Sequence, residues 1–465
     1  RPSLFRHIWR TGRRKPAAAI NIRQQRLTNL VAFARSHSPF YAQHYRQVSS
    51  SPKLYELPPV TKPELMACFD DWVTDTAVTK AGVNAFVADP SLVGRPYLDR
   101  YAVHTTSGTS GTPGIFLHDS DALTIYDLLL LRGWLAWLGP WRLLSSLRPG
   151  FREVFVVATG AHFAGVATTE RLRRWYPWPA GRLQNLSVLL PLVELVQKLN
   201  HLQPTVLVIY PTALSLLARA QRDGRLSIRP LFIVTSGEWL APVVRDEAAA
   251  VFNCPVRDIY GCSEFIYMAL ACNEGWLHVN ADWLILEPVD AGYSPVSPGQ
   301  ASHTVLLTNL ANRIQPLIRY DLGDSITLRP EPCPCGNPLP ALRVEGRRDE
   351  ILTFPTAEGA VVQVLPMALA AVVEATPGVQ RYQLIQPEPL TLAVRLEVVP
   401  GAEGSRVWET AVTRLREYLT SQGLTGVTIR ETTVLPRCDP HSGKFRQVWS
   451  EVGSTTGNRH QKTNL

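Results

Sequence analysis

The sequence predicts an α/β protein with a large N-terminal α/β domain of several subdomains and a small C-terminal α+β domain. Between Val154 and Thr235, β-rich runs of strand length alternate with segments of helical periodicity, which is typical of a largely parallel sheet covered by helices. After Asp349 the pattern changes to a unit of about a hundred residues, an ordinary domain size. The length of 465 residues is sufficient for both domains.

The expected elements follow in chain order. Apolar residues at helical spacing predict a helix over 18–37, and Thr61-Lys62-Pro63-Glu64 is typical of a helix start with proline in the first turn. Ser187 to Leu199 predicts an amphipathic helix with Pro191 in its first turn. Buried strands are predicted at Val154–Thr159, Thr205–Ile209 and Leu231–Thr235, and a later β subdomain at Leu284–Glu287 and Thr304–Leu307.

The C-terminal unit is predicted from two helices and three strands. They are expected at Pro366–Ala375 and Ser405–Gln422 for the helices, and at Tyr382–Ile385, Thr391–Leu396 and Val427–Glu431 for the strands. The polar residues 453–465 predict a disordered tail.

Composition and charge favour a cytoplasmic protein. The net charge of +8 comes partly from basic residues near both ends, which we interpret as solubilising arms because no nucleic-acid-binding module accompanies them. No uninterrupted apolar run of about eighteen residues predicts a membrane span, and no apolar signal-peptide region follows the basic start. Seven scattered cysteines argue against a disulfide framework. We therefore expect neither nucleic acid nor a membrane as a partner.

The segment Thr105–Gly114 consists of small hydroxyl residues and glycines with one proline and no charge. Its backbone N–H groups and hydroxyls suit phosphate oxygens, although such a run is also typical of a solvated connection. It lacks the Gly-Lys-Ser/Thr ending of a Walker loop, which disfavours a P-loop NTPase. The candidate phosphate-binding residues are Thr106, Ser107, Gly108, Thr109, Ser110 and Gly111.

Further polar motifs follow this segment in one order. They are Ser236-Gly237-Glu238, Asp258-Ile259-Tyr260-Gly261-Cys262-Ser263-Glu264, Arg319-Tyr320-Asp321-Leu322-Gly323-Asp324, Glu345-Gly346-Arg347-Arg348-Asp349-Glu350 and Pro440-His441-Ser442-Gly443-Lys444. The series resembles the adenylate-forming superfamily of acyl-CoA synthetases, peptide-synthetase adenylation domains and luciferases. The Asp-Ile-Tyr-Gly-x-Ser-Glu form and a Cys-Pro-Cys-Gly element resemble its phenylacetate–CoA ligase-like branch. The resemblance extends from about Leu27 to Val448.

The resemblance implies roles for the reacting groups. Glu264 would associate with Mg²⁺, and Ser263 would contact the α-phosphate or the substrate carboxylate. Lys444 would bridge carboxylate and α-phosphate during adenylation. Asp349 would be the hinge, within 346–350, about which a mobile domain of residues 351–452 rotates relative to residues 1–345. Glu264 could equally face a helix dipole, and Asp349 could be an ordinary helix cap.

The resemblance also implies a nucleotide site. Asp258 would meet the adenine amino group, Tyr260 would stack on the base, and Asp324 and Arg347 would contact the ribose hydroxyls. The same site would include Gly237, Glu238 and Gly261. As alternatives, Tyr260 could be a core residue, Asp324 a turn residue and Arg347 a surface cation.

The acid-binding residues are less sharply indicated. The segment Thr159–Gly165 resembles the stretch that lines the carboxylate substrate in this branch, which makes Gly160 and His162 candidates. Tyr210 could add an aromatic wall, although aromatics at strand ends usually serve packing. An aromatic or cyclic acid fits these residues, but the acid itself cannot be named.

Three cysteines and one histidine form a candidate metal site. Cys272, His278, Cys333 and Cys335 offer three sulfurs and one imidazole, which suit tetrahedral Zn²⁺. Some phenylacetate–CoA ligase-like proteins carry a structural zinc in this region. The alternative is a buried cysteine, an unrelated histidine and a Cys-Pro-Cys-Gly turn.

The resemblance implies ATP- and Mg²⁺-dependent adenylation of a carboxylic acid, followed by acyl transfer to coenzyme A. An amine or amino acid acceptor, giving an amide, is the alternative. A nucleotide-binding protein with weakened catalysis also stays open, because Thr112 and Gly114 stand where many relatives carry a lysine.

Overall fold

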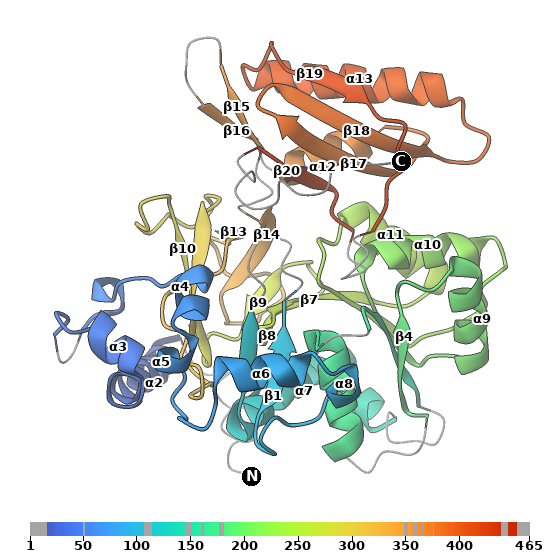
Figure 1. Ribbon diagram of the computed structural model, residues 1–465. Helices are drawn as coiled ribbons and strands as arrows, with labels where there is room; N and C mark the ends of the chain where they lie inside the picture. The colour runs from blue at the N-terminus through green and yellow to red at the C-terminus, as the bar shows by residue number, and fades with distance from the viewer. Residues whose placement is uncertain are drawn as a thin grey trace. The chain divides into compact units, whose positions relative to one another are not determined.

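The computed structural model describes residues 16–49, 52–106, 114–145, 151–159, 162–175, 181–347, 352–356, 361–364, 366–374, 376–438 and 445–452. These residues form two compact units (Figure 1). The first contains 16–322 and 326–344, and the second contains 345–438 and 445–452, with 323–325 assigned to it. A large and a small unit of mixed helices and strands confirm the predicted α/β fold class.

A nine-stranded mixed sheet is the centre of the first unit. Its order is β13-β14-β9-β8-β7-β6-β5-β3-β4. The strands are β3 (Glu153–Val157), β4 (Leu183–Ser187), β5 (Val206–Ile209), β6 (Phe232–Ser236), β7 (Val256–Cys262), β8 (Phe265–Ala271), β9 (Leu277–Val279), β13 (Asp324–Leu328) and β14 (Ala341–Arg347). The pairs from β4 to β7 are parallel, whereas β7, β8, β9 and β14 pair antiparallel. Within this sheet, the predicted parallel pattern is therefore correct only for strands β3 to β7.

Helices alternate with the parallel strands of this sheet. They are α8 (Ala164–Trp175), α9 (Leu192–Leu202), α10 (Pro211–Arg222) and α11 (Pro242–Phe252). The predicted helix over 187–199 was wrong in its first turn, because Ser187 ends β4 and Pro191 is the N-cap of α9 with extended backbone angles. Buried leucines of α9 and α10, including Leu199, Leu214 and Leu217, pack together with β5 and β6 in one core cluster.

The N-terminal region supplies a helical cap and a small hairpin. The helices are α2 (Pro16–His37), α3 (Pro39–His44), α4 (Lys62–Ala67), α5 (Phe69–Trp72) and α6 (Lys80–Val87), with 3₁₀ turns η1 (Leu54–Glu56) and η2 (Pro90–Leu92). Helix α4 starts after Thr61 with Pro63 in its first turn, as predicted, and the structure adds a capping box between Thr61 and Glu64. Strands β1 (Ala102–Thr105) and β2 (Ile115–His118) form an antiparallel hairpin that the sequence analysis did not identify.

The predicted β subdomain is a three-stranded sheet in the order β10-β11-β12. Its strands are β10 (Leu284–Val289), β11 (Thr304–Asn309) and β12 (Tyr320–Asp321). Their buried residues join those of the N-terminal helices, the hairpin and β8 in the largest hydrophobic core of the first unit.

Helix α7 (Ser120–Ser145) packs against β8 and is interrupted at Gly139, whose φ is 69°. Within the described residues, its segment Ser120–Gly139 is long and apolar enough to cross a membrane by length and composition alone. Tyr126 and Leu129 of this segment belong to the core. Arg132 makes two hydrogen bonds of 2.9 Å to the buried carboxylate of Asp282. These contacts place α7 within the packing of the first unit.

The second unit is a four-stranded sheet with two helices. The sheet order is β19-β18-β17-β20, formed by β17 (Val379–Glu388), β18 (Thr391–Val398), β19 (Thr428–Glu431) and β20 (Val448–Ser450). Helices α12 (Pro366–Glu374) and α13 (Gly404–Ser421) contact each other and the central strands, and β15 (Leu352–Pro355) pairs with β16 (Val361–Val364). The predicted helices and three strands are confirmed, whereas β15, β16 and β20 were not predicted.

Candidate active site

Two predicted motifs meet at neighbouring strand ends of the large sheet. Strands β6 and β7 are parallel, with Thr235 opposite Asp258 and Ser236 opposite Ile259. Gly237 follows β6 directly and has a φ of 81°, a left-handed conformation that favours glycine. The two motifs therefore lie together at the carboxyl edge of parallel strands, where α/β sheets bind ligands.

The turn from β7 to β8 is tight because its glycine lies against the facing strand. The strands are antiparallel, and their register shifts between Tyr260 and Cys262. A Cβ atom on Gly261 would lie 1.8 Å from the carbonyl oxygen of Ile266, a distance that no other residue could tolerate. This close approach explains why the motif has glycine at the position before Cys262.

The Glu264 side chain is buried and oriented from the β subdomain. Glu264 is only 3% exposed, and the hydroxyl of Tyr320 donates a hydrogen bond of 2.8 Å to its Oε1. Asn309 Nδ2 donates to the Glu264 carbonyl at 3.0 Å and to the Tyr126 hydroxyl at 2.8 Å. Because a carboxylate accepts about four hydrogen bonds or metal contacts, Glu264 keeps capacity for a metal ion or its water after the tyrosine bond.

Ser263 is held through both its side chain and its carbonyl. Its hydroxyl donates to the Thr105 carbonyl at 3.1 Å, and His118 Nε2 donates to the Ser263 carbonyl at 2.8 Å. This bond fixes the His118 tautomer, with Nδ1 left to accept from the Tyr126 hydroxyl at 3.4 Å. Burial lowers the pKa of His118 to about 4, so the imidazole is neutral at physiological pH.

Asp258 and Glu238, both predicted nucleotide contacts, each accept from a threonine. Thr235 Oγ1 donates to Asp258 Oδ1 at 2.6 Å, and burial raises the pKa of Asp258 to about 6. Glu238 Oε2 accepts from the backbone N–H and the hydroxyl of Thr212, at 3.1 and 2.8 Å. Since α10 begins at Pro211, the Glu238 carboxylate caps that helix. Glu238 therefore has a structural role in addition to its predicted contact with the nucleotide.

The other predicted nucleotide contacts also lie on strands of the large sheet. Tyr260, in β7, is 9% exposed, and Asp324, at the start of β13, is 7% exposed. Arg347 ends β14, the neighbour of β13. The structure therefore puts Asp324 and Arg347 on adjacent strands, and their contact with a ribose stays a prediction.

The motif Arg319–Asp324 contains residues that hold the fold. Arg319 forms an ion pair of 3.3 Å with Glu287 while it is only 5% exposed. Asp321 accepts from Thr304 Oγ1 at 2.6 Å and from the Tyr293 hydroxyl at 2.9 Å. The side chain of Asp321, the first aspartate of the motif, therefore stabilises the three-stranded sheet and its surroundings.

The two ends of the glycine-rich segment are hydrogen-bonded to each other. Thr106 N donates to the Gly114 carbonyl at 2.9 Å, and Gly114 N donates to Thr106 Oγ1 at 2.7 Å. A Cβ atom on Gly114 would lie 2.6 Å from the Phe116 ring, which explains glycine there. The predicted residues that lie outside the described part of the chain are Ser107, Gly108, Thr109, Ser110, Gly111, Gly160, Asp349 and Lys444.

His162 and Tyr210, the predicted acid-binding residues, are both buried. The Tyr210 hydroxyl accepts from the Ala158 N–H at 3.3 Å, and burial raises the pKa of Tyr210 to about 12. Tyr210 also packs in a small core cluster with Val157. His162 is 1% exposed, and its carbonyl accepts from Thr105 N at 2.8 Å. Tyr210 therefore has a packing role, while His162 lies beside the residue that binds Ser263.

Sequence reasoning missed the residues that orient the motif. Tyr320 is inside a quoted motif, but only the fold shows that its hydroxyl meets Glu264. His118 is an isolated histidine on a buried strand, and no spacing in the sequence connects it with Ser263. Such partners are found by tertiary proximity alone.

A compact metal-ligand cluster lies at the far end of β8. The ligand atoms of Cys272, His278, Cys333 and Cys335 are all within 4.8 Å of one another. Cys272 Sγ is 3.8 Å from Cys333 Sγ, and Cys335 Sγ is 3.2 Å from His278 Nε2. Three sulfurs and one imidazole nitrogen at these separations fit a four-coordinate zinc site without an open position.

The surroundings of the cluster also suit a metal. His278 Nδ1 donates to the Leu339 carbonyl at 2.9 Å, which leaves Nε2 as the ligand atom and orients the ring. The Asn337 N–H donates to Cys335 Sγ at 3.5 Å, a bond that stabilises a thiolate. Gly336 has a φ of 79°, so the Cys-Pro-Cys-Gly turn needs its glycine. All four predicted ligands are brought together.

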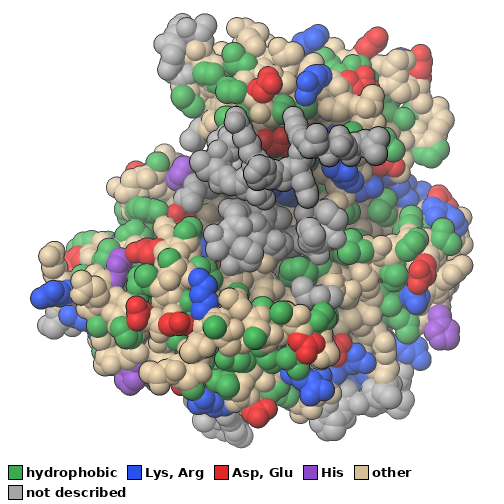
Figure 2. All heavy atoms as spheres, viewed as in Figure 1, with side chains coloured by type: hydrophobic (Ala, Val, Ile, Leu, Met, Phe, Trp, Pro, Cys, Tyr) green, Lys and Arg blue, Asp and Glu red, His purple; other side chains and the backbone are tan. Residues whose placement is uncertain are grey.

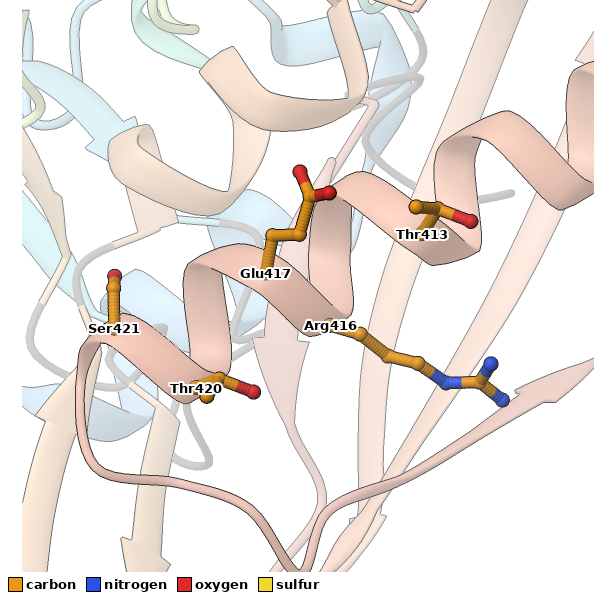
Figure 3. Close-up of a pocket in the computed structure, with 5 residues that line it drawn as sticks. All are labelled: Thr413, Arg416, Glu417, Thr420 and Ser421. Atoms are coloured by element: carbon orange, nitrogen blue, oxygen red, sulfur yellow. The ribbon is translucent and has the colours of Figure 1, made fainter.

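Helix α13 of the second unit carries a shallow hollow of about 570 Å³. Its lining residues all come from this helix (Figure 3) and are Thr413, Arg416, Glu417, Thr420 and Ser421. None of them is a predicted site residue. The hollow is an open face of one helix and offers no converging set of polar groups.

Figure 2 shows charged side chains of both signs scattered over one face of the molecule. On the face drawn in Figure 2, acidic side chains lie among the basic ones and are interspersed with apolar residues. The basic residues near both ends lie outside the described part of the chain, so their interpretation as solubilising arms stays a prediction.

Comparisons with known proteins extend over most of the chain. No family model matches it. A phenylacetate-coenzyme A ligase from Thermus thermophilus is 24% identical over 460 residues, which span 92% of this chain and 95% of the relative. Protein CapK from Staphylococcus aureus is 31% identical over 138 residues, a local match of 29% of each protein.

Solved structures share the fold. A 2-hydroxyisobutyryl-CoA ligase in the postadenylation state, in complex with 2-HIB-AMP, superposes with a TM-score of 0.68 and 21% identity over 93% of this chain and 89% of the other. The same ligase in its thioesterification state, with 2-HIB-AMP and CoA, superposes with a TM-score of 0.56 and 21% identity over 94% and 90% of the two chains. The architecture is therefore that of adenylate-forming CoA ligases.

Proposed function

Because this chain belongs to the adenylate-forming superfamily and to its phenylacetate–CoA ligase-like branch, we propose that it activates a carboxylic acid with ATP and transfers the acyl group to coenzyme A. The observation that carries this proposal is the β7–β8 turn, where Glu264 is buried, bound by Tyr320, and adjacent to the doubly held Ser263. A fixed carboxylate beside a fixed hydroxyl suits a reaction between two anionic reactants.

In the first half-reaction, a carboxylate oxygen of the acid attacks the α-phosphorus of ATP, and the bond to the leaving pyrophosphate breaks. Mg²⁺ held at Glu264 would supply charge neutralisation for the phosphates. The Ser263 hydroxyl, now on the Thr105 carbonyl at 3.1 Å, would turn to an oxygen of the substrate carboxylate or the α-phosphate. Asp258 and Tyr260 would bind the adenine, and Asp324 with Arg347 the ribose.

In the second half-reaction, the thiol sulfur of coenzyme A attacks the acyl carbon, and the bond to AMP breaks. Lys444 is proposed to act in the first half-reaction only, because the superfamily rotates its small domain about the hinge position, here Asp349. Restricting that hinge with Asp349→Pro should block acyl transfer and spare adenylation.

The cluster of Cys272, His278, Cys333 and Cys335 is proposed to hold one structural Zn²⁺. The closed set of four ligands supports a role in stability, since a catalytic zinc keeps one coordination position for water or substrate. ATP and coenzyme A as reactants support the cytoplasmic location expected from the sequence.

Acid-dependent ATP–pyrophosphate exchange with a panel of carboxylic acids tests the proposed function. Exchange with at least one acid, followed by AMP formation on addition of coenzyme A, is the expected result. Nucleotide binding without exchange for any acid would instead support a protein with weakened catalysis. AMP formation with amines or amino acids, and none with coenzyme A, would replace the thioester product by an amide.

The Lys444→Ala variant separates the two half-reactions. It should lower acid-dependent AMP formation by at least about a hundredfold, the scale of losing one positioned charge stabiliser. Acyl transfer from a chemically supplied acyl-adenylate should be much less affected. Equal loss in both half-reactions, measured by product formation under single-turnover conditions, would contradict the assigned role.

A further inference from the structure

The connection from β11 to β12 begins with three buried amide side chains. Asn309, Asn312 and Gln315 are 0%, 2% and 1% exposed, and we call residues 309–315 the amide loop. Asn309 Oδ1 accepts from Ala311 N and Asn312 N, at 3.0 and 3.2 Å, which shapes the loop itself. Burying an amide is costly unless its other groups are also bonded, so the partners outside the loop indicate its task.

Two of these amides bind strand β2. Leu117 N donates to Gln315 Oε1 at 2.6 Å, and Asn312 Nδ2 donates to the Leu117 carbonyl at 2.7 Å. Gln315 Nε2 donates to the Ile115 carbonyl at 3.4 Å. Among the described strands, β2 pairs with β1 alone. Side-chain amides therefore bond the backbone groups of β2 that a third strand would otherwise bond.

Strand β2 is the strand into which the glycine-rich segment leads. It starts at Ile115, directly after Gly114, whose carbonyl accepts from Thr106 N at 2.9 Å. Because bonded and non-bonded pairs alternate along an antiparallel ladder, Ile115 and Leu117 present their backbone groups to the edge away from β1. The amide loop thus fixes β2 from the side opposite β1, at the end of the proposed phosphate-binding segment.

The third amide binds the carboxylate motif. Asn309 Nδ2 uses its two hydrogens on the Glu264 carbonyl at 3.0 Å and the Tyr126 hydroxyl at 2.8 Å. His118, the last residue of β2, donates through Nε2 to the Ser263 carbonyl and accepts at Nδ1 from Tyr126. The consecutive carbonyls of Ser263 and Glu264 are therefore held by one chain of hydrogen bonds that joins the amide loop to β2.

The N-terminal helical region holds the same loop by other contacts. Trp72 Nε1 donates to the Pro316 carbonyl at 2.7 Å. Thr74 donates through its N–H to the Ile314 carbonyl and through Oγ1 to the Arg313 carbonyl, both at 3.0 Å. These bonds hold the loop backbone without contact to β2 or to the carboxylate motif, so they provide a matched comparison for the three amides.

We infer that Asn309, Asn312 and Gln315 are positioning residues that fix the glycine-rich segment relative to Glu264. This inference rests on the proposed adenylation function, in which the phosphates of ATP bind the glycine-rich segment and their Mg²⁺ is held at Glu264. The amides touch neither reactant and act through β2 and the Glu264 carbonyl. Their loss should therefore weaken the binding of ATP and leave the binding of the acid unchanged.

The Gln315→Met variant of the full chain tests the inference in the acid-dependent exchange assay. It leaves the Leu117 N–H without its 2.6 Å bond, and the KM for ATP should rise by about tenfold while the KM for the acid stays within about twofold. Thr74→Val is the matched control, because it removes a bond to the same loop from the other side. It should lower Tm and keep both KM values.

A merely structural loop predicts a different result. Both variants would then lose thermal stability, and the KM for ATP would be unchanged in each, which overturns the inference. If circular dichroism shows that Gln315→Met is unfolded, Asn312→Ala replaces it, since this variant removes the bond to the Leu117 carbonyl. The same rise in the KM for ATP is expected for Asn312→Ala, and an unchanged KM in the folded variant overturns the inference.

Titration with ATP and Mg²⁺ in the absence of acid separates the two proposals. Unmodified protein that binds ATP but shows no exchange with any acid overturns the adenylation alone. The dissociation constant for ATP then decides the inference, and it should be about tenfold higher in Gln315→Met than in Thr74→Val. Unmodified protein that does not bind ATP overturns both proposals.

Discussion

The two ends of strand β8 carry two polar clusters of opposite character. At its start, Ser263 and Glu264 belong to one contiguous motif, and their partners are a tyrosine hydroxyl, a backbone carbonyl, an imidazole and an amide. At its end, Cys272 begins a cluster that is completed by Cys333 and Cys335 from a segment about sixty residues later in the chain. One site keeps unused acceptor capacity, and the other presents a closed set of four ligand atoms.

This difference teaches how each site depends on the fold. The motif at the start of β8 obtains its geometry from a local turn that only Gly261 allows, and distant residues then adjust its orientation. The cluster at the end is assembled from separate segments: His278 lies on β9, which pairs with β14, and Cys333 and Cys335 lie in a turn whose Gly336 has a φ of 79°. Changes at the start should therefore affect chemistry, and changes at the end should affect stability.

The largest effect is expected for Glu264→Gln. Loss of the carboxylate charge that would bind Mg²⁺ should lower acid-dependent pyrophosphate exchange by about a hundredfold or more, with little change in Tm. The matched control is Glu274→Gln, an exposed carboxylate near the other end of β8, which should leave exchange unaltered. A variant with normal exchange at saturating Mg²⁺ would contradict the role of Glu264.

A smaller kinetic effect is expected for Tyr320→Phe. The variant removes the 2.8 Å bond to Glu264, and a hydrogen bond to a charged group is worth about 1.5–3 kcal/mol. Exchange should fall by about tenfold or more, and the Mg²⁺ concentration for half-maximal activity should rise. Tyr293→Phe removes a comparable bond to Asp321 and should change the Mg²⁺ dependence little. The same dependence in both variants would argue against an orienting role of Tyr320.

At the other end of β8, Cys333→Ser should abolish zinc binding and lower Tm by several degrees, since a structural metal site contributes folding energy. Metal analysis of purified protein should find about one zinc per chain in the unmodified protein and much less in the variant. Cys68→Ser, a free cysteine outside the cluster, is the control and should keep the metal. Absence of zinc from the purified unmodified protein would contradict the proposed zinc site.

The smallest effect is expected for Asp258→Asn, and it depends on pH. The pKa of Asp258 is raised from 3.8 to about 6 in the folded protein, so folding is disfavoured by its ionisation and the penalty is complete only above about pH 6. The variant should therefore have a Tm a few degrees higher than the unmodified protein at pH 7–8. This advantage should disappear as the pH falls from 6 to 4.

Glu331→Gln, an exposed carboxyl, is the control for the pH dependence and should show no such change in Tm. A constant Tm difference from pH 4 to 8 for Asp258→Asn would show that burial of this carboxylate is not the cause. Weaker ATP binding by the same variant would support its proposed contact with adenine.

The sequence by itself determined the α/β class, the small C-terminal α+β unit and the order of the motifs, because helix caps, strand patterns and glycine turns are local. It also named all four residues of the cysteine and histidine cluster, because three thiols and an imidazole together suit few tasks other than metal binding. Only the tertiary structure decided that Tyr320 orients Glu264, that Glu238 caps α10, and that β7, β8, β9 and β14 pair antiparallel. These relations join segments far apart in the chain, and burial in a shared core, which no short pattern records, brings them together.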